Sequence, residues 1–469
     1  MIILLIILVV MPVYGVSEQA IINSVTAFYP KIIAARERVR QAEGQYLADQ
    51  GAFDAALTGS SLAYENGVYD GLRYTEVGIK KPLPIANASL FGGYSKSSDN
   101  PYPEPLDNDS NNTLDGGRVK LGASVSLLRG FLINPDTAAL TISERGIDIA
   151  NAQLELTEFM VITAARKAYY NYTAARQLYA ISQEILALRQ ARLDQVQAQV
   201  LGGEKPELDL IDAQQALLKS ESDLILAQQS VQERALALSL YYRDESGNRV
   251  VLAPETAIAS SQIVVPARDQ MATRLAQLKE SRSDIRALDF EIEQTEAKLA
   301  LYKNQVLPDV TLKVSASKDF GQDSKTPSDG RLKREERFNA DLAVSIPLQT
   351  NKQAGFIATA RAKIAELEQK KRLIQDSLDI DTTAVYTQIT SLYTVYENLK
   401  QDVAFSKQLL AAESVRFRNG DSDSIRMNIR EQALYESTAK LADAVNKIRK
   451  AIAEYDLILM SIRRERPSE

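Results

Sequence analysis

Cysteine, histidine and tryptophan are all absent from this chain of 469 residues. Without cysteine there can be no disulfide, no thiolate nucleophile and no lipid anchor attached through an N-terminal cysteine. Without histidine there is no imidazole for acid–base catalysis, and most zinc sites are excluded as well. The carboxylates, lysines and serines form no constellation that indicates catalysis. We therefore expect no enzymatic activity, no cofactor and no bound metal.

An excess of positive charge is also lacking, since 55 lysines and arginines face 61 acidic residues and the net charge is −6. Nucleic-acid binding requires a clustered basic surface. Here the basic residues are interleaved with acidic ones along the helical runs. Nucleic acid is therefore not expected as a partner.

Long hydrophobic runs are scarce too, and the one at the N-terminus is too short to cross a bilayer. Residues 1–13 are apolar with one proline, and Tyr14, Gly15 and Val16 follow. This pattern predicts a signal peptide over residues 1–15, although no Lys or Arg precedes the apolar run. The alternative is a buried N-terminal segment. No later run reaches the ~20 apolar residues of a membrane helix, so an exported chain can enter a membrane only through strands.

The same helical hairpin occurs twice in the sequence. One constant offset aligns Gly203 with Gly420, Leu208 with Ile425, and residues 215–217 with residues 432–434, in both cases Gln-Ala-Leu. Each copy follows a helical run and a pair of alternating strands. The pattern predicts a tandem duplication. The first repeat covers residues 16–250, with strands over about 55–128 and a helical hairpin over about 138–246. A connector covers 251–268. The second repeat covers 269–469, with strands over about 309–348 and a hairpin over about 356–462.

The predicted strands alternate between apolar and small or polar residues. Over residues 118–128, Val119, Leu121, Ala123 and Val125 alternate with lysine, glycine and serine. Such alternation suits a barrel wall with lipid on one side and water on the other. The segments 73–81 and 88–97 form an extra strand pair in the first repeat. The sequence leaves open whether this pair joins the wall or folds outside it.

The helical runs are too long for an ordinary globular domain. Residues 147–201 contain no glycine or proline, and at ~1.5 Å per residue a helix of this length extends roughly 80 Å. Leu178, Ile181, Ile185 and Leu188 have the spacing of a coiled-coil seam. Gly202 and Gly203 end this run and a second one follows, so the two helices must pack antiparallel.

A few strands per chain cannot close a barrel around water, and open edges in hydrocarbon cost several kcal/mol per unpaired group. Strands from other copies must therefore complete the wall. Three chains would supply about twelve strands, or about eighteen if the extra pair joins. The long helices carry charge along their length, so we expect them to project into an aqueous compartment and form a tube.

Several segments resemble the outer-membrane efflux proteins, the TolC-like family of trimeric exit ducts. They are Leu201-Gly202-Gly203 with Leu208 to Ala213, Phe417 to Gly420 with Ile425 to Met427, Val125 to Phe131, Val344 to Leu348, and Val306 to Val310. The resemblance implies a mixed α and β membrane protein, with a trimeric transmembrane β-barrel in the outer membrane and an α-helical tunnel in the periplasm. It also implies a homotrimer that docks a periplasmic adaptor (membrane fusion) protein and an inner-membrane transporter. The function would be passive conduction in a tripartite efflux or type I secretion system. The alternative is a soluble periplasmic coiled-coil scaffold or adaptor protein.

The hairpin turns are the candidate periplasmic gate and adaptor-docking region. The resemblance implies an acid six residues after the hairpin glycine, and Asp209 has this position, with Asp212 one turn further on. In the second hairpin Arg426 and Ile429 stand at the matching positions, so Asp421 and Asp423 are the alternative gate charges. Asp423 or Ser424 can equally cap the following helix. Asp209 can equally interact with the positive end of the helix dipole.

Two glycines and one phenylalanine complete the candidate set. Gly203 and Gly420 are predicted to adopt positive φ at a helix end. Phe417 matches an aromatic position near the closed tip, or simply packs in the core. Aromatic residues at the strand ends are either an interfacial girdle or scattered loop residues; they are Tyr64, Tyr69, Tyr74, Phe91, Tyr94 and Phe320.

Overall fold

The structure is a computed structural model, and it describes residues 16–66, 69–98, 113–256, 263–321 and 336–460. The expected signal peptide of residues 1–15 lies outside these ranges. So do most of the polar loops expected after residues 98 and 321. The side chains of Tyr64 and Tyr69 are outside the described set as well.

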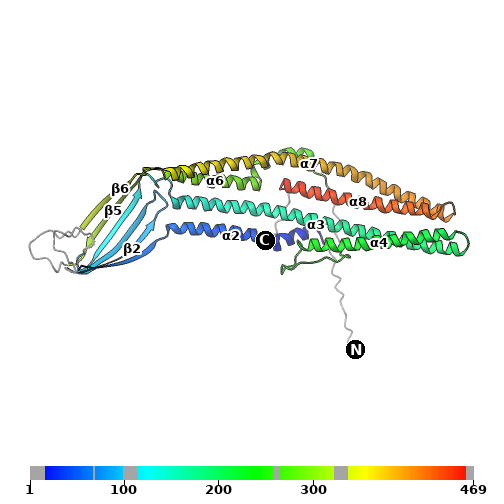
Figure 1. The fold of residues 1–469 in the computed structure, drawn as a ribbon, viewed down its shortest axis with the longest axis horizontal. Coiled ribbons are helices and arrows are strands. Elements are labelled where there is room, and N and C mark those ends of the chain that lie inside the picture. Colours follow the sequence, from blue (N-terminus) through cyan, green and yellow to red (C-terminus); the bar gives the residue numbers. More distant parts are fainter. Residues whose placement is uncertain (1–15, 67–68, 99–112, 257–262, 322–335, 461–469) are drawn as a thin grey trace, which may run out of the picture. The chain divides into compact units, whose positions relative to one another are not determined.

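The described chain consists of long helices and one sheet (Figure 1). The first half contains α1 (Glu18–Phe28), α2 (Pro30–Gln50), the short 3-10 helix η1 (Gly51–Phe53), β1 (Ala56–Asn66), β2 (Tyr69–Pro82), β3 (Ser89–Ser98), β4 (Arg118–Ser126), α3 (Pro135–Leu201) and α4 (Glu207–Ser239). The second half contains α5 (Arg268–Ser281), α6 (Ser283–Asn304), β5 (Asp309–Asp319), β6 (Glu336–Ser345), α7 (Asn351–Arg418) and α8 (Ser424–Ile458).

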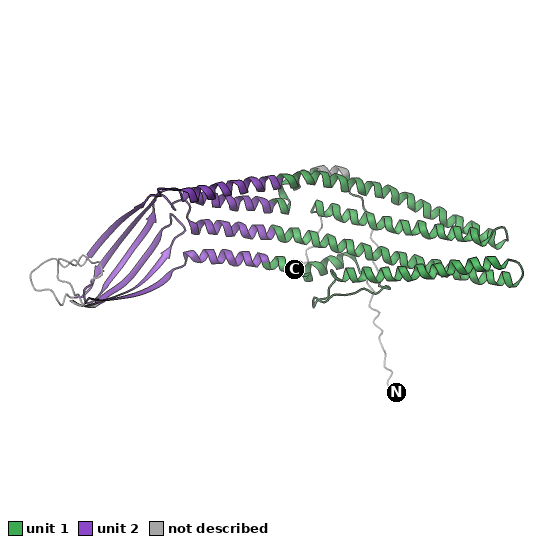
Figure 2. Ribbon diagram, in the orientation of Figure 1, with its two compact units in different colours: residues 1–37, 152–285, 372–469 green, residues 38–151, 286–371 purple. Residues whose placement is uncertain are grey.

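Two compact units divide the chain (Figure 2). Unit 1 consists of residues 1–37, 152–285 and 372–469, and unit 2 consists of residues 38–151 and 286–371. The 67 residues of α3 and the 68 residues of α7 are shared between the two units. None of the described helices combines the length and the apolar character that crossing a bilayer requires.

The sheet of unit 2 has six antiparallel strands in sequence order, β1 to β6. The β4–β5 pair joins the two halves of the chain, with Arg118 opposite Asp319. The extra strand pair of the first half belongs to the same sheet as β2 and β3. The pair expected over residues 73–97 therefore joins the sheet of the other strands.

The two faces of the sheet differ in polarity, as the alternation predicts. Large apolar side chains on one face are 39–74% exposed; this apolar face carries Leu57, Val77, Ile79, Leu90, Tyr94, Val119, Leu121, Phe338, Leu342 and Val344. The opposite, polar face carries buried serines and the buried Arg118 and Asp319. Leu62 is an exposed apolar residue on the polar face. Soluble sheets show the reverse arrangement, with apolar side chains buried.

The interpretation of the strand aromatics as one girdle is wrong for two residues. Tyr74 and Phe91 lie on the polar face, because Tyr74 pairs with Ser97 and Phe91 pairs with Gly122. Successive residues of a strand point to opposite faces, so the register alone decides their side. Tyr94 lies on the apolar face and is 43% exposed.

Helix boundaries differ from the sequence pattern in two places. The helix expected over residues 17–50 is split at Tyr29, which is extended because Pro30 follows it. The helix expected over residues 267–307 is split at Arg282, whose backbone is extended with ψ 139°. The Arg282 side chain donates to the backbone oxygen of Ile458 at 2.9 Å, and this contact anchors the break to α8.

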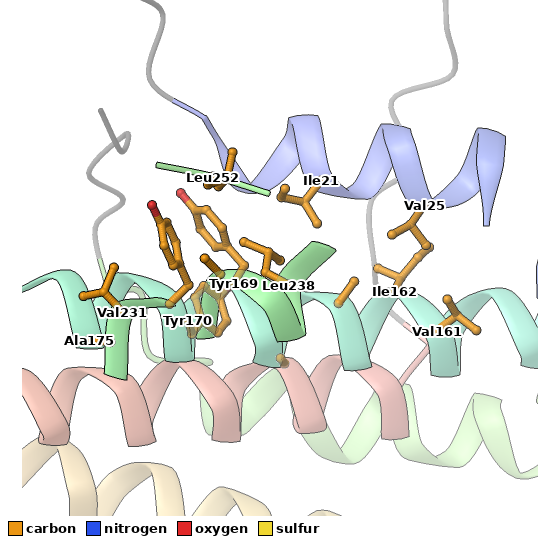
Figure 3. Close-up of a cluster of buried hydrophobic side chains, with 14 of the residues drawn as sticks. Ile21, Val25, Val161, Ile162, Tyr169, Tyr170, Ala175, Val231, Leu238 and Leu252 are labelled. Carbon is orange, nitrogen blue, oxygen red and sulfur yellow. The ribbon is translucent and has the colours of Figure 1, made fainter. Parts of the chain in front are cut away.

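The largest hydrophobic core of unit 1 joins α1, α3 and α4. Figure 3 shows Ile21 and Val25 of α1 directed toward α3, where Val161 and Ile162 lie. An ion-pair network reinforces this core, since Arg166 of α3 contacts Glu18 of α1 at 2.5 Å and Asp456 of α8 at 2.8 Å. The N-terminal helix is therefore held by both burial and charge.

Candidate functional site: the two hairpin turns

Two equivalent turns connect α3 to α4 and α7 to α8. Gly203 has φ 79° and Gly420 has φ 82°, so the prediction of positive φ is confirmed at both. Around Gly203 three backbone N–H groups, from residues 202–204, donate to the carbonyls of 198, 200 and 199. The same three hydrogen bonds recur around Gly420, displaced by the repeat offset. Each helix therefore ends in the glycine-based cap that satisfies its last carbonyls.

A small apolar cluster packs the two hairpins together next to these turns. It consists of Val196 of α3, Ala213 of α4, Phe417 of α7 and Met427 of α8, all buried. Phe417 is 2% exposed. The Nζ atom of Lys205 lies 3.8 Å from the centroid of the Phe417 ring. This lysine belongs to the first turn and covers the aromatic residue of the second hairpin.

A buried group of charges continues the contact between the hairpins. Glu431 of α8 is fully buried, and its Oε2 atom lies 3.5 Å from Arg189 Nε and 3.0 Å from Arg192 Nη1. Both arginine side chains, from α3, are less than 5% exposed. Breaking a buried ion pair by removing one partner costs about 3–5 kcal/mol. The two hairpins are therefore fastened by charges that cannot separate without exposure to water.

Further hydrogen bonds extend the network across three helices, α3, α4 and α8. Arg189 Nη1 donates to the Ala216 carbonyl at 3.0 Å and to Ser220 Oγ at 2.7 Å, both on α4. Arg192 donates to the side-chain oxygen of Asn428. The Nδ2 of Asn428 donates to Asp212 of α4 at 2.7 Å. One chain of hydrogen bonds thus links both helices of the first hairpin to α8.

Burial governs the ionisation of this group. Burial raises the pKa of Glu431 above its ordinary value, and the two arginines oppose that rise. Burial also lowers the pKa of Arg192, which Glu431 opposes. The protonation state of Glu431 is therefore coupled to the packing of the hairpins.

The candidate acids occupy different environments. Asp209 is in the first turn of α4, with a side chain 16% exposed and 3.8 Å from Lys205 Nζ. Asp423 caps α8 by accepting from the Arg426 backbone N–H at 2.8 Å, as the capping alternative predicts. The exposed Arg426 side chain lies 3.8 Å from the same carboxylate. Asp421 is exposed. Among the described residues, no ion pair involves its carboxylate.

The structure brings most of the candidate residues together, but it also shows partners that the sequence analysis missed. Arg189, Arg192 and Glu431 were not predicted. The seam prediction was wrong at Leu188, which is 39% exposed, because the buried stripe runs through Ile185, Arg189, Arg192 and Val196. Two arginines at seam spacing are the signal that could have identified this site, since charge in a coiled-coil seam needs a buried partner.

No other chemistry is apparent in the described ranges. No three acidic side chains gather there in a way that could hold a metal ion. Unit 2 has an open cavity of about 480 Å³ between α3, α6 and α7. Its wall includes Tyr302 and Phe356, whose rings stack at 4.9 Å. Glu291, Lys298 and Lys363 also line the cavity, and they form no arrangement typical of catalysis.

Comparison with known proteins agrees with this fold. Residues 74–242 match the sequence model of the family described as outer membrane efflux protein. The chain resembles that family in sequence and has the fold of its channels. The family is one of channels rather than enzymes. Among curated proteins, none matches this sequence.

Three solved channels illustrate the likeness. VceC of Vibrio cholerae has a TM-score of 0.64 and 16% identity, over 94% of this chain and 95% of that one. The open state of MtrE from Neisseria gonorrhoeae has a TM-score of 0.65 and 14% identity, over 94% and 88%. CmeC of Campylobacter jejuni has a TM-score of 0.62 and 13% identity, over 94% and 85%. At such identities the likeness concerns the fold.

Proposed function

We propose that this protein is the outer-membrane channel of a tripartite efflux or type I secretion system. Three copies close one β-barrel, and their helices form a tunnel in the periplasm. Exported solutes pass through passively after an inner-membrane transporter and a periplasmic adaptor deliver them. In this proposal the barrel spans the outer membrane.

The observation that carries this proposal is the sheet with an exposed apolar face and two free edges. In the described chain β1 and β6 each pair on one side only. Ten large apolar side chains face outward on one side, which suits hydrocarbon better than water. The two edges differ, so β1 of one copy pairs with β6 of the next and a ring closes head to tail.

The number of strands favours three copies. The six strands of the described part of each chain give about twelve in a dimer and about eighteen in a trimer, and barrels of about 16–18 strands enclose an aqueous channel. The polar face then lines the lumen. The same closure explains why an isolated chain exposes apolar surface.

The hairpin turns are the proposed gate and adaptor-docking region. Gly203, Asp209, Asp212, Phe417, Gly420, Asp421, Asp423 and Arg426 gather there with the buried Glu431 network. A closed tip requires the hairpins to pack, and an open tip requires them to separate. The buried contacts between the hairpins hold the packed state, and an adaptor supplies the interaction energy that opposes it.

Conductance tests the proposal directly. Detergent-extracted protein is reconstituted into a planar bilayer, and single channels are recorded before and after neutralisation of Asp209, Asp421 and Asp423 in turn. We expect discrete channels whose cation preference falls in at least one variant. Absence of any channel from protein that sediments with the outer membrane would contradict the conduction function. An unchanged cation preference in all three variants would remove these acids from the gate.

A further inference from the structure

Three lysines from three strands lie on the polar face of the sheet around one aromatic ring. The Nζ atoms of Lys120 on β4 and Lys313 on β5 lie 5.9 Å and 5.1 Å from the centroid of the Phe91 ring. Lys80 on β2 is directly opposite Phe91 in the β2–β3 ladder. The register places Lys80 level with Phe91 and places Lys120 and Lys313 two residues to either side of that level, so the three ammonium groups surround the ring.

Phe91 can take this position only because its neighbour in the ladder, Gly122, has no side chain. A Cβ atom placed on Gly122, its ladder neighbour, would lie 2.3 Å from Phe91 Cζ. The end of the ring therefore occupies the space above Gly122, and two lysines lie within 6 Å of its centroid. A cation–π contact attracts an ammonium group to a ring without cancelling its charge, unlike a carboxylate.

The acids of the polar face form no ion pair with these three lysines in the described part of the chain. Asp319 is engaged by Arg118 at 2.7 Å and by Arg337 at 3.5 Å. Glu76 accepts a hydrogen bond from the Tyr74 hydroxyl at 3.1 Å. Asp341 is opposite Lys313 in the β5–β6 ladder. Within the described ranges, none of the three lysines has a carboxylate within ion-pair distance.

We infer that Lys80, Lys120 and Lys313 form a positive belt in the lumen that favours the passage of anions, including carboxylate-bearing solutes. This inference rests on the proposed barrel, in which the polar face lines the lumen and each of three copies contributes the same set. A ring of like charge raises the local concentration of its counter-ions and repels its co-ions. The belt is separate from the acids of the hairpin turns.

The opposite face supplies a matched control. Lys81, Lys96 and Lys318 are exposed lysines on strands β2, β3 and β5, and their register places them on the apolar face. Lys80 and Lys81 are neighbours in sequence with side chains on opposite sides. Lys318 is paired with Glu336 at 3.0 Å. Neutralising either set of three lysines removes the same charge, but from opposite faces of the sheet.

The experiment compares the triple variants K80Q/K120Q/K313Q and K81Q/K96Q/K318Q with the wild type in planar bilayers. The chloride-to-potassium permeability ratio is obtained from reversal potentials in KCl gradients. The Debye length is about 30 Å at 0.01 M and about 3 Å at 1 M, so the effect must be largest in dilute salt. We expect the polar-face variant to lower the ratio by at least about twofold in dilute KCl and by much less in 1 M KCl. The variant K80R/K120R/K313R retains the wild-type ratio.

Each outcome is decisive. An unchanged ratio in the polar-face variant overturns the belt and leaves the conducting channel intact. Equal losses in both triple variants also overturn it, because the effect would then not depend on the face. If the triple variant does not assemble, K80Q, K120Q and K313Q are measured singly, and three unchanged ratios contradict the inference. Absence of conductance in the wild type contradicts the proposed function itself.

Discussion

Glu431 of α8 lies between Arg189 and Arg192 of α3, with its carboxylate 3.5 Å and 3.0 Å from the two guanidinium groups. Replacing Glu431 by alanine leaves two buried arginines without their acid, and we expect the hairpin contact to lose about 3–5 kcal/mol. Hydrogen exchange of the peptides around residues 189–196 and 424–434 measures this loss. The control is Glu436→Ala, an exposed position on the same helix. Equal protection in the two variants contradicts a fastening role for Glu431.

The same residue predicts a pH dependence of the hairpin contact. The pKa of Glu431 is raised above its ordinary value by burial, against the attraction of Arg192 and Arg189. Binding of the proton therefore favours the packed state. This contribution is complete below the unfolded pKa of about 4.3 and is lost as the pH rises through the higher folded pKa. Asp212 of α4 belongs to the same network through Asn428.

Comparison with Glu431→Gln isolates this effect from the titration of other carboxylates. We compare the hydrogen-exchange protection of the hairpin peptides in the wild type and in Glu431→Gln. As the pH falls from 7 toward 4, the protection of the wild type should rise relative to that of the variant. Hydrogen exchange corrected for intrinsic rates measures it. A difference that is constant across this range contradicts the link between Glu431 protonation and packing.

Replacing glycine by alanine is expected to destabilise the protein at the two hairpin turns and to stabilise it at Gly355. A Cβ atom at Gly203, Gly420 or Gly355 would meet no atom within 4 Å. The positive φ of Gly203 and Gly420 makes alanine unfavourable by about 1 kcal/mol there. Gly355 lies inside α7, where alanine favours the helix by about 1 kcal/mol. Thermal unfolding of the three single variants tests the contrast, and a stabilised Gly420→Ala would contradict the cap.

The strand glycines predict a packing effect. Alanine at Gly122 displaces the Phe91 ring and also approaches the Val314 carbonyl, at 2.6 Å from an ideal Cβ. We expect a loss of about 1–3 kcal/mol, as for other overpacked sites. Gly59→Ala is the control, since its Cβ would meet its nearest atom, the Glu76 carbonyl, at 3.9 Å. The temperature at which the proposed trimer dissociates in detergent measures both effects. Equal temperatures would contradict the close packing of Phe91 on Gly122.

The sequence predicted the features that depend on local pattern. The alternation of apolar and polar residues predicted the two faces of β4. The glycines that end the helical runs predicted the two turns at Gly203 and Gly420. These succeed because a strand has a period of two and a helix end needs positive φ. The sequence could not decide whether β2 and β3 join the sheet, because strand pairing is a long-range choice.

The buried charged residues are not repeated in the two halves of the sequence. At the constant offset, Glu431 corresponds to Gln214, Arg189 to Ser406 and Arg192 to Leu409. The duplication therefore predicts the backbone of both hairpins and not the network between them. The arginines come from one repeat and the acid from the other. Only the packing of α3 against α8 reveals that they are partners.

The mass of the assembled particle tests the central claim, that separate chains share one barrel wall, most directly. Protein extracted from the outer membrane is analysed by size exclusion with light scattering, with the mass of bound detergent subtracted. The account predicts a single species of three chains, each close to the 51.8 kDa of the full sequence or lighter by the mass of the predicted signal peptide. A monomer that stays in solution without detergent would contradict the shared barrel.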